Sequence, residues 1–209
     1  MEERMMKEVS MTVVRRMPRY YQQICQLQKE GVQRISSGAL AERMGLTASQ
    51  IRQDFNCFGG FGQQGYGYQV DSLREELEKI LCLDRGHSAI LVGVGHLGSA
   101  LLRNFEFAAS GIQVVGAFDP DVNVVDRKIG GVTVQSLDKM EDFVRRNGVD
   151  VAVLTLPAAA APETAEKLAD WGVRGIWNFT GADLPVENRI PVEEVEFSQT
   201  LMVLNYRMK

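Results

Sequence analysis

The chain has 209 residues, of which 45% are hydrophobic and 24% are charged, and its formal net charge is −4. This length corresponds to one large domain or two small ones, and this composition excludes a disordered tail or a disulfide-stapled miniprotein. No apolar run reaches the ~20 residues of a membrane span and the N-terminus lacks an apolar signal segment, so we expect no membrane partner. The three cysteines are odd in number and lack CxxC spacing, which argues against a zinc site or a disulfide framework. We therefore expect the protein in a reducing cytoplasm.

The charge is divided unevenly along the chain. Residues 1–85 hold 12 Lys and Arg against 11 Asp and Glu, a net of +1, whereas residues 86–209 hold 11 against 16, a net of −5. A basic segment ahead of an acidic one is typical of a small DNA-binding module joined to an acidic partner domain. The sequence pattern also changes from helical periodicity to alternating strands and helices, which predicts a domain boundary near Asp84–His87.

The segment Ser36–Phe55 has the spacing of a helix-turn-helix. Ser36 or Ser37 can cap a short helix, Gly45 suits the left-handed residue that ends it, and Thr47 can cap the next helix. This second helix is predicted to turn five polar side chains outward: Thr47, Ser49, Gln50, Arg52 and Gln53. These side chains can pair with base edges or phosphates, although a merely solvated polar face is the alternative interpretation.

A glycine-rich stretch follows the second helix. Five of the nine residues from 59 to 67 are glycine, interleaved with Phe61 and Tyr66. This composition predicts a β-hairpin wing beside the recognition helix, with a plain structural hairpin as the alternative. A helix over Ser72–Leu83, capped by Asp71 or Ser72, is expected to connect the wing to the second domain. The predicted DNA-binding residues are Arg34, Ser36, Ser37, Thr47, Ser49, Gln50, Arg52, Gln53, Gln64 and Tyr66.

The second half opens with a dinucleotide-binding pattern. A buried strand over Ala89–Val92 runs into the glycine fingerprint Gly93–Gly98, and a helix is expected over Ser99–Ala108. Strand, fingerprint and helix in this order are the context that the motif requires. Gly93 permits the tight turn, Gly95 lets a pyrophosphate approach the backbone, and Gly98 lets the helix lie against the strand.

The fingerprint is accompanied by an acidic residue at the expected distance. A strand over Val114–Phe118 ends at Asp119, 21 residues beyond Gly98. A carboxylate there accepts hydrogen bonds from the adenosine ribose and repels a 2′-phosphate, so NAD(H) is favoured over NADP(H); a turn residue is the alternative. A further strand over Asp150–Leu156 ends at Leu156–Pro157, beside the crevice where a nicotinamide would lie. The residues predicted from these patterns to bind the cofactor are Gly93, Val94, Gly95, His96, Leu97, Gly98, Asp119, Leu156 and Pro157.

The sequence offers little chemistry for a dehydrogenase. Its two histidines, His87 and His96, fall in the linker and the phosphate loop, and it contains no Tyr-xxx-Lys pair. Too few residues remain beyond the dinucleotide-binding core for a substrate domain, so we expect a sensor and not an enzyme. A small NAD-dependent oxidoreductase, or a module that binds CoA or another nucleotide, stays open as an alternative.

The chain resembles the Rex family of bacterial redox-sensing transcriptional repressors over almost its whole length. The resemblance is carried by motifs from both halves: Pro18-Arg19-Tyr20-Tyr21, Ile35-Ser36-Ser37, Gln50-Ile51-Arg52-Gln53-Asp54, Phe58-Gly59, Gly65-Tyr66-Gly67-Tyr68, the Val92–Gly98 fingerprint, Phe118-Asp119, Leu156-Pro157-Ala158, Asn178-Phe179 and the terminal helix. It implies an α/β protein with a winged helix-turn-helix domain over 1–85, a Rossmann domain over 86–191 and a dimerisation helix over 192–209.

The resemblance also implies a function. Family members are homodimers with exchanged C-terminal helices, which bind operator DNA in the apo or NAD⁺ state and release it on binding NADH. Phe197 matches the position where the family places a phenylalanine near the nicotinamide of the partner subunit.

This chain departs from the family pattern at particular positions. Gln53 and Gln64 stand where typical members carry basic residues, in the recognition helix and at the wing tip. Gln22, Asn104 and Glu196 stand where some members use an arginine, a tyrosine and an aspartate in the redox switch. These departures bear on the operator and on the details of the NADH response, and they suit a diverged paralogue within the family.

Overall fold

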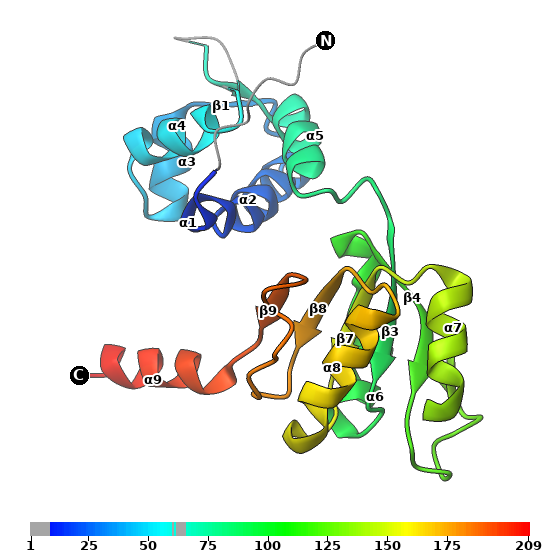
Figure 1. Cartoon of the computed structure of the whole chain (residues 1–209). Helices are drawn as coiled ribbons and strands as arrows, with labels where there is room; N and C mark the ends of the chain where they lie inside the picture. Colours follow the sequence, from blue (N-terminus) through cyan, green and yellow to red (C-terminus); the bar gives the residue numbers. More distant parts are fainter. Residues whose placement is uncertain (1–8, 60, 62–65) are drawn as a thin grey trace. The chain divides into compact units, whose positions relative to one another are not determined.

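The computed structural model describes residues 9–59, 61 and 66–209. The chain forms two compact units, one ending at Asp84 and the other beginning at Arg85 (Figure 1). Among the described residues, no helix has both the length and the apolar character that crossing a membrane requires.

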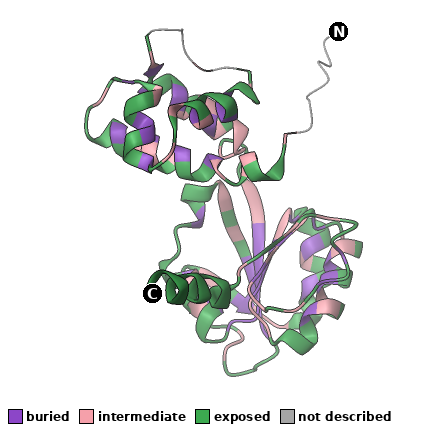
Figure 2. Ribbon diagram, turned by 90° about the vertical axis from the view of Figure 1, so that its left-hand side faces the viewer, coloured by how far each residue is buried: buried purple, intermediate pink, exposed green. Residues whose placement is uncertain are grey.

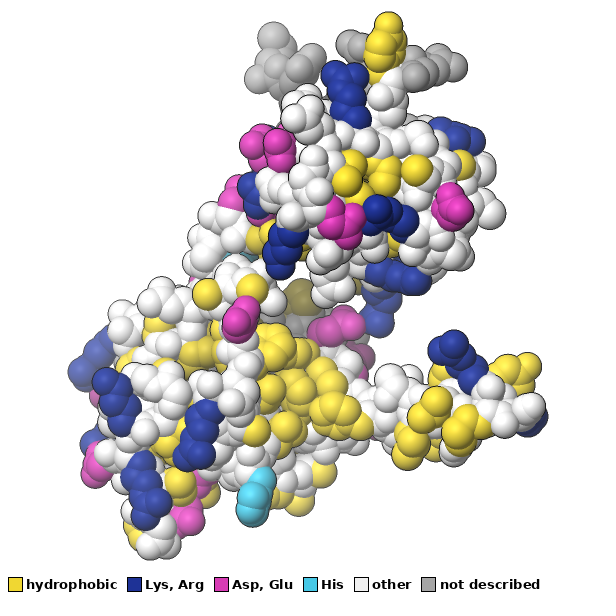
Figure 3. Space-filling model, turned by 180° about the vertical axis from the view of Figure 1, so that it is seen from behind, with side chains coloured by type: hydrophobic (Ala, Val, Ile, Leu, Met, Phe, Trp, Pro, Cys, Tyr) yellow, Lys and Arg dark blue, Asp and Glu magenta, His cyan; other side chains and the backbone are white. Residues whose placement is uncertain are grey.

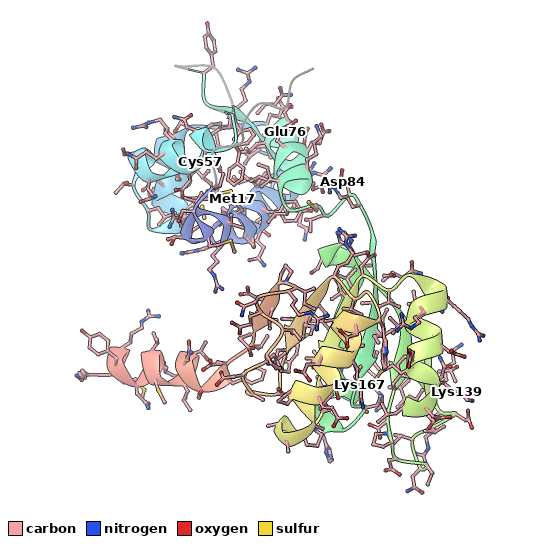
Figure 4. All side chains as sticks on the ribbon, viewed as in Figure 1. Met17, Cys57, Glu76, Asp84, Lys139 and Lys167 are labelled. Carbon is pink, nitrogen blue, oxygen red and sulfur yellow. The ribbon has the colours of Figure 1, made fainter. Side chains whose placement is uncertain are left out.

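The first unit is a small helical domain with one short strand pair. Its elements are α1 (Met11–Val14), α2 (Met17–Lys29), β1 (Arg34–Ile35), α3 (Ser37–Met44), α4 (Ala48–Asn56), β2 (Tyr68–Gln69) and α5 (Val70–Ile80). β1 and β2 are antiparallel. The helices bury a shared core that includes Met17, labelled in Figure 4, together with Leu40 and Phe55. This is the helical architecture that the sequence predicted for this half.

Local capping explains where the two helices of the helix-turn-helix begin and end. The Ser36 hydroxyl accepts a hydrogen bond from the Ala39 N–H at 3.1 Å, and α3 ends at Gly45 with φ of +65°. The Thr47 hydroxyl accepts from the Gln50 N–H at 3.1 Å and starts α4. These caps confirm the predicted ones, because a side-chain oxygen at this position satisfies a helical N–H that lacks an intrahelical partner.

The cap predicted for the connecting helix is wrong. α5 begins at Val70, behind Gln69, and no side chain caps it. The Val70 N–H donates instead to the Gln33 carbonyl at 2.9 Å, across the β1–β2 pair. Because the backbone of another segment already satisfies this donor, the helix starts before Asp71 and Ser72 and does not need their side chains.

The second unit is built on a twisted sheet. Among the described residues it has seven strands in the order β5-β6-β4-β3-β7-β8-β9. Their bounds are β3 (His87–Val92), β4 (Ile112–Phe118), β5 (Lys128–Ile129), β6 (Val132–Gln135), β7 (Val151–Leu154), β8 (Gly175–Asn178) and β9 (Val192–Glu194). All neighbouring pairs are parallel except β5–β6. The six parallel strands have the order of a Rossmann fold, which confirms the predicted fold class.

Helices cover both faces of this sheet. α7 (Met140–Asn147) and α8 (Ala161–Asp170) pack with Ile90 and Val92 on one face, and α6 (His96–Asn104) packs with Leu91 on the other. Three short 3-10 turns, η1 (Phe107–Ser110), η2 (Leu137–Lys139) and η3 (Ala158–Ala160), complete the connections. α6 ends four residues earlier than predicted, because Phe105 takes an extended conformation at its C-cap.

The C-terminal segment contributes both a strand and a helix. β9 joins the edge of the sheet, and α9 (Phe197–Arg207) follows it. Every residue of α9 is exposed, as its green colour in Figure 2 shows. Its apolar side chains, such as Leu201 at 59% and Leu204 at 50% exposure, are therefore open to contact from outside the subunit.

Candidate functional site

The phosphate loop lies between the end of β3 and the start of α6. Gly93 has φ of +95°, and a Cβ there would stand 2.7 Å from the backbone nitrogen of Leu156. A Cβ on Gly98 would stand 2.1 Å from the Gly93 carbonyl oxygen. At Gly95, by contrast, an added Cβ would meet nothing within 4 Å. The backbone is thus closely packed at two glycines and open at the third, where the N-terminus of α6 begins. This arrangement leaves room for an anion against the helix N–H groups.

Asp119 fastens this loop to the end of β4. Its side chain is 8% exposed overall, and Oδ2 accepts a hydrogen bond from the Val94 N–H at 2.5 Å. The Asp121 N–H donates to Oδ1 at 2.8 Å. A carboxylate oxygen has two acceptor positions, so each oxygen of Asp119 retains one for a further donor such as a ribose hydroxyl.

Thr155 holds the same loop from the opposite side. It follows β7, and its hydroxyl donates to the Gly93 carbonyl at 2.6 Å while its N–H donates to the Val92 carbonyl at 2.9 Å. β3 lies between β4 and β7, so the chain order reverses here and opens a crevice at the carboxyl ends of β3 and β7. Sequence reasoning missed Thr155, although a hydroxyl residue directly after a buried strand and before Leu156–Pro157 was a usable signal.

The other predicted cofactor residues surround this crevice or lie beyond it. His96 and Leu97 are exposed on the first turn of α6, Leu156 is half-buried and Pro157 is exposed. Phe197 is 61% exposed at the start of α9, and its ring centroid lies 6.4 Å from that of Phe179. The structure therefore brings Phe197 close to the aromatic residues at the end of β8.

Those aromatic residues continue across one face of the second unit. Phe179 is in contact with Trp177 at 4.5 Å between centroids, and Trp177 with Phe105 at 5.3 Å. Figure 3 shows hydrophobic side chains gathered on this unit and again along α9. An exposed apolar surface of this kind is typical of protein–protein interfaces and of ligand-binding grooves.

The helix-turn-helix presents most of its predicted DNA-binding residues to solvent. Arg34, Ser36, Thr47, Ser49, Arg52, Gln53 and Tyr66 are exposed, and Ser37 is half-buried. The Arg52 guanidinium donates to the Ser37 hydroxyl at 3.0 Å, which links the recognition helix to the start of α3. Gln64 lies outside the described residues. Of the predicted wing, the described residues show Gly67 at φ of +71° against the Ile35 carbonyl.

Gln50 differs from its neighbours on the recognition helix. It is half-buried, and its amide nitrogen donates to Asp54 Oδ1 at 2.9 Å. The prediction that it turns outward like Arg52 therefore fails in part. The reason is Asp54, which sequence reasoning did not single out although it interrupts the apolar stripe of Ile51 and Phe55.

Asp54 is the centre of a buried polar network. It is 1% exposed. Arg16 donates to both of its oxygens at 2.7 Å, and the Tyr20 hydroxyl donates to Oδ2 at 2.7 Å. With Gln50, each carboxylate oxygen accepts two hydrogen bonds, so the acceptor capacity of the group is filled. The network ties α4 to the beginning of α2.

Burial and pairing act in opposite directions on these groups. Burial alone would raise the pKa of Asp54, but the hydrogen bonds from Arg16, Tyr20 and Gln50 outweigh it and hold the pKa below the ordinary 3.8. Burial and the bond to Asp54 raise the pKa of the Tyr20 hydroxyl well above its usual range. At neutral pH the carboxylate is charged and the phenol is neutral.

The three positions that depart from the switch pattern are exposed on separate elements. Gln22 lies on α2, Asn104 at the end of α6, and Glu196 just before α9. Asn104 donates to the Ala100 carbonyl at 3.1 Å, and Glu196 accepts from the Gln199 amide at 2.7 Å. In the described part of the chain, no group of three or more His, Cys, Asp or Glu residues could hold a metal ion.

Comparison with known proteins accounts for both units. A family model described as "Putative DNA-binding protein N-terminus" matches residues 8–56, and a model of a CoA binding domain matches residues 84–182. The redox-sensing transcriptional repressor Rex of Caldicellulosiruptor saccharolyticus is 46% identical over 202 residues, 97% of this chain and 92% of that protein. Rex of Clostridioides difficile is 43% identical and covers 97% of both chains. The chain belongs to the Rex family.

Solved structures lead to the same family. The crystal structure of RSP in complex with β-NAD⁺ and operator DNA matches with a TM-score of 0.91 and 45% identity, covering 96% of this chain and 92% of that one. RSP in complex with β-NADH matches with a TM-score of 0.89 and 42% identity, covering 97% and 95%. The predicted Rex-family resemblance, with its helix-turn-helix and Rossmann architecture, is confirmed.

Proposed function

We propose that this Rex-family protein is a transcriptional repressor that binds operator DNA in the apo or NAD⁺ state and releases it when NADH binds. The observation that carries the proposal is the phosphate loop, which Asp119 and Thr155 fasten in place in the same chain as an exposed recognition helix. One unit can therefore hold a dinucleotide while the other faces DNA.

The cofactor is assigned to the crevice at the ends of β3 and β7. The pyrophosphate lies against the loop at Gly95 and the N-terminus of α6, and Asp119 accepts hydrogen bonds from the adenosine ribose. The negative charge of Asp119 disfavours a 2′-phosphate, so NADH binds better than NADPH. The nicotinamide lies toward Leu156 and Pro157, where Phe197 of a partner subunit completes the pocket.

DNA binding is assigned to the first unit. Residues near the N-terminus of α4, among them Ser49 and Gln50, face base edges, and Arg52 reaches a base or a phosphate. Ser36 and Thr47 lie at the two capped helix N-termini, which favour contacts to phosphates. Arg34 and the wing residues Gln64 and Tyr66 extend this interface. Because the operator DNA of a bacterium lies in its cytoplasm, we place the protein there.

We infer further that the protein acts as a homodimer and catalyses no reaction. The exposed apolar side chains of α9 need a partner surface, and a twofold arrangement gives each α9 the same environment. Of the described residues at the crevice, His96 is exposed on α6 and the Thr155 hydroxyl is already bonded to Gly93, and neither is held as the proton donor of a dehydrogenase would be.

A mobility-shift experiment tests the proposal. A duplex selected by the protein from random sequence is titrated with protein in the presence of NAD⁺, NADH, NADPH or CoA. We expect retention with NAD⁺ and release with NADH at much lower concentration than with NADPH. CoA serves as the control for the CoA-binding family model that matches residues 84–182. Release by CoA but not by NADH would refute the assignment of the ligand, and no sequence-specific retention would refute repression.

A further inference from the structure

The recognition helix α4 contains a fully paired, buried carboxylate beside a half-buried glutamine. Asp54 links α4 to Arg16 and to Tyr20 of α2, and Gln50 lies one turn before it on the same helix. Gln50 is the third residue of α4, which is where helix-turn-helix proteins contact base edges. Gln50 is half-buried as a residue, and its amide nitrogen is bonded to Asp54.

The chemistry of the pair fixes the orientation of the Gln50 amide. An ionised carboxylate only accepts hydrogen bonds, whereas a glutamine amide has a donor end and an acceptor end. The nitrogen of Gln50 must therefore face Asp54, at the observed 2.9 Å, because the reverse orientation would place two acceptors against each other. Arg16 and Tyr20 keep the carboxylate charged and in place, so Asp54 cannot turn to accommodate a flipped amide.

We infer that Asp54 determines base specificity through Gln50, by committing one N–H of the amide and leaving one donor and one acceptor, in fixed order, for the DNA. The inference rests on the proposed function. The major-groove edge of adenine offers an acceptor and a donor side by side, which matches what remains of the amide. Guanine offers two acceptors, and pairing with both would need the N–H that Asp54 occupies. Asp54 is thus a positioning residue that makes Gln50 accept adenine and reject guanine.

The experiment separates this role from a structural one. The wild-type chain selects a duplex from random sequence, and all single base-pair variants of one half-site are then measured by competition. We expect one position where A is preferred to G by about 5-fold to 150-fold, the range of a good bidentate contact. In Asp54→Asn, residue 54 offers a donor as well as an acceptor and can hold the amide in either orientation, so most of this preference disappears.

Tyr20→Phe is the matched control, because it removes one hydrogen bond from the same carboxylate and leaves the bond to Gln50. It should lower the melting temperature of the protein and leave the A-over-G preference unchanged. If Asp54→Asn instead weakens binding to all duplexes by the same factor, as a loss of stability alone would do, Asp54 does not set specificity and the inference is wrong.

A second variant keeps the inference testable if Asp54→Asn does not fold. Gln50→Glu leaves Arg16 and Tyr20 on Asp54, but its carboxylate is repelled by that of Asp54 and can only accept hydrogen bonds. The preferred base at the same position should change from A to C, whose N4 amino group is a donor. No change at any position would show that Gln50 does not contact a base. A wild-type chain without sequence-specific binding would instead refute the proposed function itself.

Discussion

Replacing Asp119 by alanine tests the carboxylate that fastens the phosphate loop to the end of β4. The carboxylate accepts from the Val94 N–H at 2.5 Å and from the Asp121 N–H at 2.8 Å. Val94 is 2% exposed, so its N–H cannot turn to water when the carboxylate is removed, and leaving it unpaired costs about 1–3 kcal/mol of unfolding free energy. Asp121 is exposed, and water can replace its lost bond.

The same change should reduce cofactor discrimination. NADH loses a ribose hydrogen bond to a charged group, worth about 1.5–3 kcal/mol, so its affinity should fall about ten- to 150-fold. NADPH had no such bonds to lose, and the repulsion of its 2′-phosphate disappears. Its affinity should therefore change much less, and the ratio of the two dissociation constants should approach one.

Calorimetric titration of wild type, Asp119→Ala and Asp121→Ala with NADH and NADPH measures these effects. Asp121→Ala is the matched control, because its carboxylate caps Asn123 and does not touch the phosphate loop. Equal affinities for NADH and NADPH in the wild type would refute the ribose assignment. An unchanged ratio in Asp119→Ala, with a lowered melting temperature, would show that Asp119 only supports the loop.

Other substitutions test the remaining contacts. Thr155→Val should weaken NAD⁺ and NADH binding alike, because the loop loses the hydroxyl bond to Gly93, and Thr155→Ser should restore binding in the same titration. Arg52→Ala should cost about 1–3 kcal/mol of specific DNA binding with relaxed base preference; equal weakening on every sequence, with a salt slope lower by about one, would identify a phosphate contact. The double change Gln53→Lys with Gln64→Arg should steepen the salt dependence of DNA binding, by ~0.9 for each new phosphate contact, and an unchanged slope would exclude both positions from the interface. Because the pKa of Asp54 is lowered in the folded chain, its contribution to stability is present above the unfolded value of ~3.9 and is lost as pH falls through the folded value. Between pH 6 and pH 2.5 the melting temperature of Asp54→Asn should fall less than that of wild type. An equal fall in both proteins would contradict the lowered pKa of Asp54.

The sequence predicted those features that neighbouring residues decide. The caps at Ser36 and Thr47 and the left-handed turn at Gly45 depend on residues within one helical turn, so their spacing was enough. The glycines of the phosphate loop belong to the same class, because each is required by backbone packing that a short motif encodes.

Features that depend on distant partners were not predicted. Asp54 is 38 residues from Arg16, and Thr155 is 62 residues from Gly93, so no local pattern joins them. The cap predicted at Ser72 failed because Gln33, far away in sequence, supplied the acceptor. The short strands β5, β6 and β9 were also missed, since their stability comes from pairing with the neighbouring strands of the sheet rather than from strong periodicity. The helix α7 was missed although Met140 and Val144, four residues apart, are both buried.

The hydrogen bonds that fasten the phosphate loop come from Asp119 and Thr155 of the same chain, so the loop is held in place without a cofactor. A loop that is already held in place before the cofactor binds provides the same binding site for NAD⁺ and NADH, since the two are identical from the adenine to the pyrophosphate. NAD⁺ and NADH then compete for one binding site. When both forms are abundant, the site is saturated. The ratio of bound NADH to bound NAD⁺ then equals the ratio of their concentrations multiplied by the ratio of their affinities. The fraction of protein bound to NADH therefore follows the NADH to NAD⁺ ratio and does not change when the total concentration of dinucleotide rises or falls.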